Sequence, residues 1–425
     1  MPLIQINVRS ELINLDIDGK IKENFEFPFI RVLSYQGKMM KIKTIDIEGI
    51  GGIKKLHLVF NAGLNVICGS NGIGKTTILN IITDAFGYNR SQIKRNAMMT
   101  KGNYKIDFYD IDSKIANSIK NYKPSEVEKV YQPEFAQFAP YVLNFGSNRD
   151  IKYKALDGIP RDRERDDFLL GDITLNGISE DDIKGWFANR YLYSKQTYGF
   201  TDIMQKNLAL ALNIFSLLDS SIEFKYIDPH SNDLILKTPN GDVYFEYLSS
   251  GYKTCMYIML GILKEIEYRF SDIVYDKYDG LILIDEIDLH LHPTWQANII
   301  LAMKKTFPSS QIIVTTHSPS ILQCLEKDEI IALDIDENNN VYQKDLQLGE
   351  YGLQGWTLEE ILKDVMGMPS TTSQLYQDTI NKFDEALDEE NVEDIKKYYN
   401  LLLKMLHPNS VTRRLLQIQI AGFEE

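Results

Sequence analysis

Cysteine, long apolar runs and positive charge are all scarce in this sequence, and each shortage argues against a class of protein. The three cysteines, Cys68, Cys255 and Cys324, lie far apart and form no Cys-x-x-Cys pair, which argues against a disulfide framework and a zinc site. No apolar run approaches the roughly 18 residues of a membrane span, and the N-terminus lacks the basic and apolar segments of a secretory signal. The pattern favours a soluble, cytoplasmic protein without a membrane partner.

The charge balance is acidic, with 46 lysines and arginines against 60 aspartates and glutamates and a formal net charge of −14. A field of this sign repels phosphate at long range, which argues against a protein that coats nucleic acid or an anionic membrane. Hydrophobic residues make up 44% of the 425 residues, enough to bury a large core and to exclude a disordered chain. A chain of this length is expected to form two or three domains or lobes.

Hydrophobic periodicity divides the chain into three parts. Residues 1 to about 60 mix β-branched and aromatic residues with polar ones, which predicts strands, and residues 64–68 form the apolar run of a strand buried on both faces. The middle part, about 100–245, combines helical and hairpin patterns, and its densely charged segment 159–172 is expected to be an exposed loop. Apolar strands then alternate with helices, and a purely helical pattern begins beyond Gly355.

A glycine-rich loop follows the first buried strand. Residues 69–76, Gly-Ser-Asn-Gly-Ile-Gly-Lys-Thr, match the phosphate-loop pattern G-x-x-x-x-G-K-[ST] and lie between a strand and a helix. Backbone N–H groups of such a loop, with the helix N-terminus behind them, cradle nucleotide phosphates. Lys75 is expected to bridge the β- and γ-phosphates, and the Thr76 hydroxyl is expected to bind Mg²⁺.

Three later elements complement this loop. Residues 281–284 form a buried strand that ends in Asp285 and Glu286, where the first acid holds Mg²⁺ through water and the second polarises the attacking water. Residues 248–252, Leu-Ser-Ser-Gly-Tyr, precede a helix and offer an anion-binding surface. His317 ends another strand and can donate to a γ-phosphate. Alone these are a turn, a helix cap and a strand-end histidine, but their order favours a joint functional role.

This order of motifs resembles the ABC-type ATPases of the SMC, RecF and OLD-like branch over about residues 40–335. The resemblance implies an α/β fold with an ABC-type ATPase head over 1–350, in which a RecA-like phosphate-loop sheet carries antiparallel β and helical lobes. An all-helical tail over 351–425 is expected to contact a second copy or a partner. The resemblance further implies that two copies sandwich two ATP molecules.

The roles that this resemblance implies fall on matching positions. The implied catalytic residues are Glu286, His317 and Lys75. The implied nucleotide-binding residues are Asn71, Gly72, Ile73, Gly74, Lys75, Thr76 and Thr77. The implied Mg²⁺ ligands are Thr76 and Asp285, and the implied contacts to the partner's nucleotide are Ser249, Ser250 and Gly251.

The chain departs from the family pattern in two places and leaves one element open. Ser250 stands where the first glycine of the family's LSGGQ-type element is usual, and Tyr252 replaces its glutamine, so the details of the contact to the partner's nucleotide stay open. Gln132 and Gln137 are both candidates for the glutamine that usually lies between the two halves of the head. Arg149 is a further candidate for a position near the nucleotide.

Missing features narrow the branch. About 170 residues separate Thr77 from Leu248 and contain no sustained heptads, which argues against the long coiled coil of SMC proteins. About 108 residues follow His317, and they show no Toprim nuclease domain of the OLD type. The chain most resembles the PtuA family, the ATPase subunits of Septu and retron-associated anti-phage systems. The resemblance implies an ATPase that regulates or positions a separate HNH nuclease of the PtuB type.

Other interpretations stay open. In a RecF-like repair clamp, the Lys- and Arg-containing segments 90–105 and 149–165 would contact DNA phosphates. A transporter ATPase would require a membrane subunit, and ATP could instead serve as a structural ligand. No metal is expected at Asp334–Asp336, which lacks the glycine of a calcium loop, or at His290–His292, which lacks further ligands.

Overall fold

The computed structural model describes residues 40–87, 91–109, 114–126, 138–149, 151–162, 165–196 and 198–423. The strands predicted before residue 40, and the candidate glutamines Gln132 and Gln137, lie outside these residues. Within them, no helix is long and apolar enough to cross a membrane.

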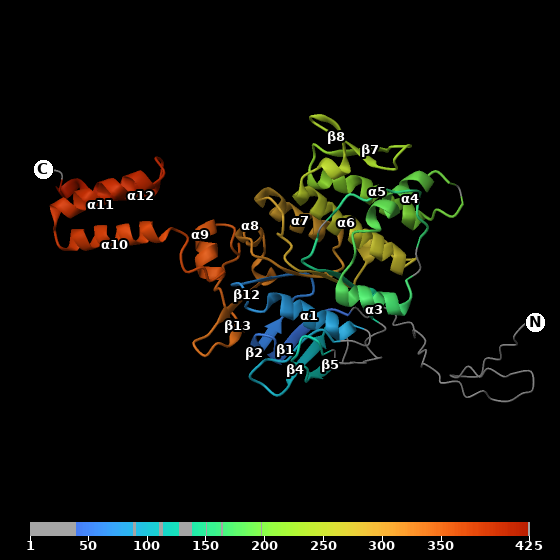
Figure 1. Cartoon of the computed structure of the whole chain (residues 1–425), viewed down its shortest axis with the longest axis horizontal. Coiled ribbons are helices and arrows are strands. Elements are labelled where there is room, and N and C mark those ends of the chain that lie inside the picture. The colour runs from blue at the N-terminus through green and yellow to red at the C-terminus, as the bar shows by residue number, and fades with distance from the viewer. Residues whose placement is uncertain are drawn as a thin grey trace, which may run out of the picture. The chain divides into compact units, whose positions relative to one another are not determined.

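A six-stranded sheet lies at the centre of the head, in the order β13-β12-β3-β11-β10-β6 (Figure 1). Five strands run parallel, and β13 pairs antiparallel with β12 at one edge. Their bounds are β3 Leu64–Cys68, β6 Val142–Phe145, β10 Leu281–Ile284, β11 Gln311–Thr315, β12 Ile330–Ile335 and β13 Val341–Gln343. The strands predicted from apolar runs at 64–68, 281–285 and 311–317 are confirmed to within two residues.

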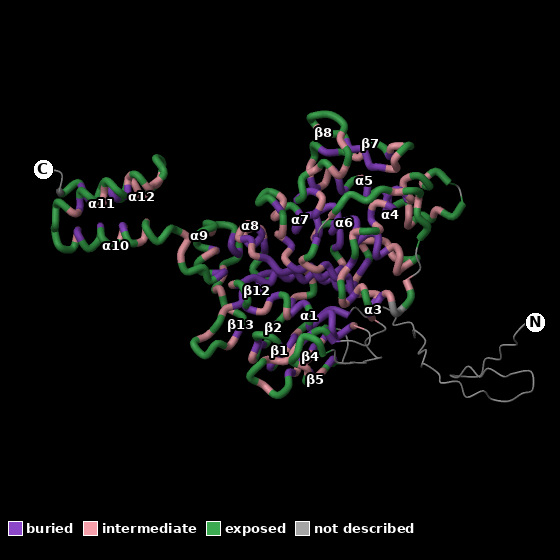
Figure 2. Tube along the Cα trace, viewed as in Figure 1, coloured by how far each residue is buried: buried purple, intermediate pink, exposed green. Residues whose placement is uncertain are grey.

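The central strands are apolar throughout because both faces of the sheet are covered. Along β3, Val66 packs into one hydrophobic core and Ile67 into another, as the two-residue period of a strand requires. Along β10, Ile282 and Leu283 divide in the same way. Figure 2 shows the buried residues gathered along these strands.

The first core, which contains Ile67 and Leu283, lies between the central sheet and a second, antiparallel sheet. This sheet has the order β2-β1-β4-β5, with bounds β1 Ile42–Ile50, β2 Ile53–Val59, β4 Gly102–Phe108 and β5 Lys114–Ile119. Helix α1, Lys75–Phe86, packs in the same core and lies between the two sheets (Figure 1). The start of the predicted lobe at about 100–245 therefore pairs with the N-terminal strands.

Helices cover the other face of the central sheet and form the second core. They include α4 Ile183–Tyr193, α5 Asp202–Leu218, α6 Ser250–Arg269, α7 Pro293–Thr306 and α8 Pro319–Leu322. Helix α3, Asp167–Asn176, packs beside α1 and β6. A three-stranded sheet, β7 Glu223–Ile227, β8 Leu234–Thr238 and β9 Gly241–Tyr244, packs beside α4 and α5.

The charged segment 159–172, predicted to be an exposed loop, is a loop only in part. Helix α3 begins inside it, because the Asp166 carboxylate caps the helix by accepting from Leu169 N at 2.7 Å. The side chain of Arg165 is buried and donates to Glu265 at 2.9 Å. The prediction failed because the partner of Arg165 lies 100 residues away in sequence.

The C-terminal region divides into two parts. Leu353, Ile361 and Val365 pack in the core of the head, where a short helix, α9 Leu358–Glu360, continues into a π-helical turn. The last three helices, α10 Gln374–Asp388, α11 Val392–Met405 and α12 Val411–Ile420, form a hydrophobic core of their own. The core of the head therefore extends to Met366, beyond the boundary expected at residue 351.

Candidate functional site

The phosphate loop connects β3 to α1 in backbone conformations that favour glycine. Gly69, Gly72 and Gly74 have φ angles of +146°, +76° and +111°, a region that residues with a Cβ rarely adopt. A Cβ on Gly69 would lie 2.6 Å from the Leu333 carbonyl oxygen. Open space surrounds Gly72, so the loop leaves its backbone accessible to an anion.

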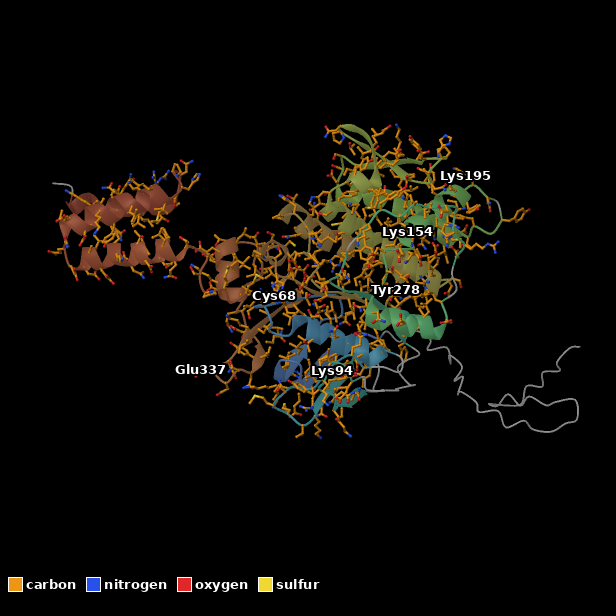
Figure 3. All side chains as sticks on the ribbon, in the orientation of Figure 1. Cys68, Lys94, Lys154, Lys195, Tyr278 and Glu337 are labelled. Atoms are coloured by element: carbon orange, nitrogen blue, oxygen red, sulfur yellow. The ribbon has the colours of Figure 1, made fainter. Side chains whose placement is uncertain are left out.

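Lys75 folds back over this loop. Its Nζ donates to the carbonyl oxygens of Gly69 and Ser70, both at 3.0 Å. Burial lowers the pKa of Lys75, although neighbouring charges offset part of this effect. Burial also raises the pKa of the neighbouring Cys68 thiol to about 12, so this cysteine, labelled in Figure 3 at the end of β3, is a protonated core residue.

The predicted Mg²⁺ ligands lie in contact. The Thr76 hydroxyl donates to the two carboxylate oxygens of Asp285 at 2.9 and 3.2 Å. Asp285 also accepts from the Thr315 hydroxyl at 2.6 Å. These residues meet because β3, β11 and β10 are neighbouring parallel strands, whose carboxyl ends share one edge of the sheet.

Glu286 lies at a strained turn after β10. Its φ angle is +48°, which is uncommon for a residue with a side chain. Its backbone N–H donates to Thr315 Oγ1 at 2.7 Å, and its carbonyl oxygen accepts from Arg149 Nη1 at 3.2 Å. The carboxylate is partly exposed, so the turn directs an accessible acid to the edge that carries the phosphate loop.

His317 follows β11 at the same edge. Its backbone N–H donates to Asp288 Oδ1 at 3.1 Å, and the adjacent Thr316 hydroxyl donates to the same oxygen at 2.7 Å. Burial, together with the positive charge of Lys75, lowers the pKa of the imidazole. His317 is therefore neutral near pH 7 and offers one ring N–H as a hydrogen-bond donor.

The Leu-Ser-Ser-Gly-Tyr element forms the N-terminus of α6. Ser249 and Ser250 are exposed, and Ser249 Oγ caps the helix by accepting from Tyr252 N at 3.2 Å. Gly251 is buried against the segment after Glu286, and a Cβ there would lie 2.9 Å from the His290 carbonyl oxygen. The exposure of the two serines makes their hydroxyl groups accessible to another molecule.

Tyr252 lies in the hydrophobic core, away from the exposed surface that a nucleotide contact would need. Its ring is buried against Trp295, with centroids 5.1 Å apart, and its hydroxyl donates to the Phe215 carbonyl oxygen at 3.0 Å. Burial raises the pKa of this phenol well above its ordinary value. Where the family uses a polar glutamine, this chain therefore has a core residue that joins α5, α6 and α7.

The residues present fit ATP and Mg²⁺. The glycine cradle, the helix N-terminus and Lys75 suit a chain of phosphates, and the Thr76 hydroxyl and Asp285 carboxylate are oxygen ligands of the kind Mg²⁺ prefers. Among the described residues, no group of three His, Cys, Asp or Glu side chains could hold a metal alone.

Three contributors to this site were not assigned a role from sequence. Thr315 joins Asp285 to Glu286, Asp288 anchors the backbone of His317, and Arg149 bonds the carbonyl oxygens of Asp285 and Glu286. The sequence signal for Thr315 and Asp288 was their place beside strand-end motifs. Arg149 was expected near the nucleotide, and the structure shows that its contacts are backbone carbonyls.

The chain is similar to several known proteins. Residues 64–323 match the family described as AAA domain, putative AbiEii toxin, Type IV TA system. The chain is 45% identical to the Septu protein PtuA of Bacillus thuringiensis over 392 residues, 91% of this chain and 99% of that protein. It is 41% identical to the Retron Ec83 probable ATPase of Escherichia coli over 100 residues, 23% of this chain and 18% of that protein.

A solved structure with a similar fold is an Smc head bound to the C-winged helix domain of ScpA. It has a TM-score of 0.46 and 15% sequence identity, and the match covers 72% of this chain and 97% of that one.

Proposed function

The chain belongs to the PtuA family of Septu ATPases and carries an AAA-type ATPase domain, and from this premise we propose that it binds and hydrolyses ATP to control a nuclease partner in anti-phage defence. In this proposal two copies meet head to head with two ATP molecules between them. The partner is an HNH nuclease of the PtuB type.

One observation carries the ATPase proposal, the direct contact between Thr76 and Asp285 at 2.9 Å. These residues are 209 positions apart in sequence. Thr76 lies in the first turn of α1, and Asp285 directly follows β10 at the same edge of the sheet. A hydroxyl after the phosphate loop and an acid after the neighbouring strand form the Mg²⁺ site of phosphate-loop ATPases. Bound there, Mg²⁺ would neutralise charge on the β- and γ-phosphates.

The remaining residues supply the chemistry of hydrolysis. Lys75 moves from the loop carbonyls to the phosphates as they enter the cradle. The accessible Glu286 carboxylate orients and polarises the attacking water, which is worth about 10²–10⁴ in rate for a well-placed general base. The neutral imidazole of His317 donates to the γ-phosphate. Ser249 and Ser250 are exposed and serve the nucleotide of the partner subunit.

The ATPase proposal is tested by turnover and binding measurements on purified protein. The wild-type chain is expected to bind a fluorescent ATP analogue and to release phosphate in the presence of Mg²⁺. Lys75→Ala is expected to lose both activities because the phosphates lose their only lysine contact in the cradle. Lys237→Ala changes an exposed lysine of the three-stranded sheet and serves as the control. Turnover by Lys75→Ala at the wild-type rate would contradict the assignment.

The partner proposal needs a separate experiment. Affinity purification of the chain expressed with its neighbouring genes is expected to recover a small HNH protein. In cells, Lys75→Ala and Glu286→Gln are expected to abolish protection from phage. If no nuclease is recovered, a protein that acts on DNA by itself becomes the better account.

A second candidate function is the RecF-like clamp. In the segment 149–165 that would contact DNA, Arg149 and the Arg165 side chain are buried and hydrogen-bonded within the head, whereas Lys154 and Arg161 are exposed. An ATP-dependent mobility shift of duplex DNA that weakens with salt, with no other protein present, would favour the clamp.

A further inference from the structure

The peptide groups of Asp285, Glu286 and Ile287 are held from both neighbouring strands. On the side of β11, Thr315 accepts from Glu286 N through its hydroxyl at 2.7 Å and from Ile287 N through its carbonyl oxygen at 3.0 Å. On the side of β6, the Phe145 carbonyl oxygen accepts from Asp285 N at 2.9 Å. Glu286 has a left-handed backbone conformation, and a residue with a side chain keeps this conformation only where its surroundings fix it in this way.

Arg149 supplies the bonds to the carbonyl oxygens of this turn. Its Nη1 donates to Glu286 O at 3.2 Å, and its Nη2 donates to Asp285 O. Its Nε donates to Gly146 O at 3.0 Å, which ties the guanidinium to the end of β6. Arg149 is 4% exposed, and each of its three nitrogens donates to a carbonyl oxygen, so the group is committed to the backbone and not open to phosphate.

From this geometry we propose that Arg149 is a positioning residue, which holds the Asp285–Glu286 turn so that the Glu286 carboxylate meets the attacking water. The inference rests on the proposed ATPase function and deepens it. Burial of a guanidinium is costly unless its donors are satisfied. Here each guanidinium nitrogen donates to a carbonyl oxygen, and two of these carbonyl groups flank the strained φ of Glu286. Without them the turn relaxes and the carboxylate is displaced.

This role differs from that of a residue that contacts ATP. A positioning residue changes the rate of the chemical step and leaves nucleotide affinity largely unchanged. The phosphate loop lies between β3 and α1, whereas Arg149 follows β6 and contacts the turn after β10. Arg149 also acts only through Glu286, because the Asp285 carboxylate keeps its own bonds to the Thr76 and Thr315 hydroxyls. Loss of Arg149 therefore has no further effect on a protein from which the Glu286 carboxylate has already been removed.

The test is a double-mutant cycle on the full chain, read by Mg²⁺-dependent ATP turnover and by the Kd of a fluorescent ATP analogue. Arg149→Lys keeps the charge but cannot reach both carbonyl groups, and kcat is expected to fall about 10- to 100-fold, the effect of a misplacement near 1 Å. The Kd and KM are expected to change by less than about threefold. In the Glu286→Gln background, Arg149→Lys is expected to leave the residual kcat unchanged.

Arg190→Lys is the matched control, because Arg190 is equally buried but held by the side chains of Asp162 and Glu267. Its kcat is expected to equal that of the wild type. An Arg149→Lys protein with wild-type kcat, or one that loses a further factor in the Glu286→Gln background, would overturn the inference. If Arg149→Lys fails to fold, Arg149→Gln is the second variant, and failure of both to bind ATP assigns Arg149 to folding and overturns the inference as well. Absence of turnover in the wild type would instead contradict the ATPase proposal.

Discussion

The phosphate loop depends on single residues whose lack of a side chain is essential. Gly69 combines a φ of +146° with the close approach of the Leu333 carbonyl oxygen from β12. Its conformation and its surroundings therefore both exclude a Cβ. The loop is shaped against the neighbouring strand before any phosphate enters it.

A first prediction concerns this residue. Gly69→Ala is expected to lower the free energy of unfolding by about 1–3 kcal/mol, the cost of one strained backbone position, and to weaken ATP binding because the loop must shift. Thermal or urea unfolding and the Kd of a fluorescent ATP analogue measure these effects. Gly355→Ala is the control, since open space surrounds Gly355. Equal stability and affinity in the two variants would show that the close approach does not constrain the loop.

At this scale the sequence predicted the residues that form recognisable motifs. Lys75, Thr76, Asp285 and Glu286 were found because their spacing relative to strands and glycines is specific, and the structure brings them to one edge of the sheet. Arg149 could not be assigned its role, because it acts on backbone carbonyls 136 and 137 positions away. Such contacts leave no pattern in the side chains that a sequence displays.

Helix α6 contributes to the structure at three places along its length. Its N-terminus presents Ser249 and Ser250, its first turn buries Tyr252 in the core, and its last turns carry a cluster of buried charges around Glu265. Glu265 is 1% exposed and pairs with Lys264, Arg269 and Arg165. This cluster ties the helix to the segment before α3.

A second prediction follows from the charge of Glu265. Burial alone would raise the pKa of this carboxyl, but attraction by Lys264, Arg269 and Arg165 outweighs it and lowers the pKa to about 2. Glu265→Gln leaves three buried cations facing a neutral amide, and the expected loss of stability is on the order of 3 kcal/mol at neutral pH. Urea unfolding of both proteins measures it.

The pH dependence gives this prediction its sign. Because the folded pKa lies below the unfolded value of 4.5, the contribution of Glu265 is complete above that pH and is lost as the pH falls toward 2. The stability difference between wild type and Glu265→Gln is therefore expected to shrink below pH 4.5. Glu223→Gln, at an exposed pair with Lys237, serves as a control with little effect at any pH. A difference that stays constant with pH would contradict the assignment.

Elements were predictable where burial is uniform and less so where charge is paired at a distance. The strands at 64–68 and 281–284 are apolar at nearly every position because helices or a second sheet cover both faces. Helix α3 was not predicted because the charged residues before it have the composition of a solvated loop. The ion pair between Arg165 and the distant Glu265 is not visible in the sequence. Tyr252 stands where a glutamine is usual in the LSGGQ-type element, and its position in the core could not be predicted from that comparison. Its ring packs on Trp295, which lies on another helix.

At the scale of the whole molecule, the cores of the head are separate from the core of the C-terminal helices. The head is built around the central sheet, and its second core extends to Met366. Helices α10 to α12 enclose a separate core that includes Phe383, Ile395 and Leu416. The head can therefore keep its nucleotide site without the last three helices, which we propose serve contacts to a second copy or to the nuclease.

A third prediction compares two truncated proteins. A chain that ends at residue 372 is expected to unfold at nearly the wild-type temperature and to bind ATP, because it retains the whole head core. A chain that ends at residue 350 loses Leu353, Ile361 and Val365, which are each at most 1% exposed, and burial of such side chains is worth about 1.5–3 kcal/mol apiece. It is expected to be largely unfolded by calorimetry. Equal behaviour of the two chains would place the boundary elsewhere.

The proposed ATPase depends on Glu286 to drive hydrolysis at a site formed by the phosphate loop and the end of β10. The most direct measurement is steady-state ATP turnover by wild type and Glu286→Gln, with ATP affinity measured on the same samples. In Glu286→Gln, kcat is expected to fall by a factor of about 10²–10⁴ while ATP binding is retained, because the amide fills the same space but accepts no proton. Turnover by Glu286→Gln at the wild-type rate would contradict this role of Glu286.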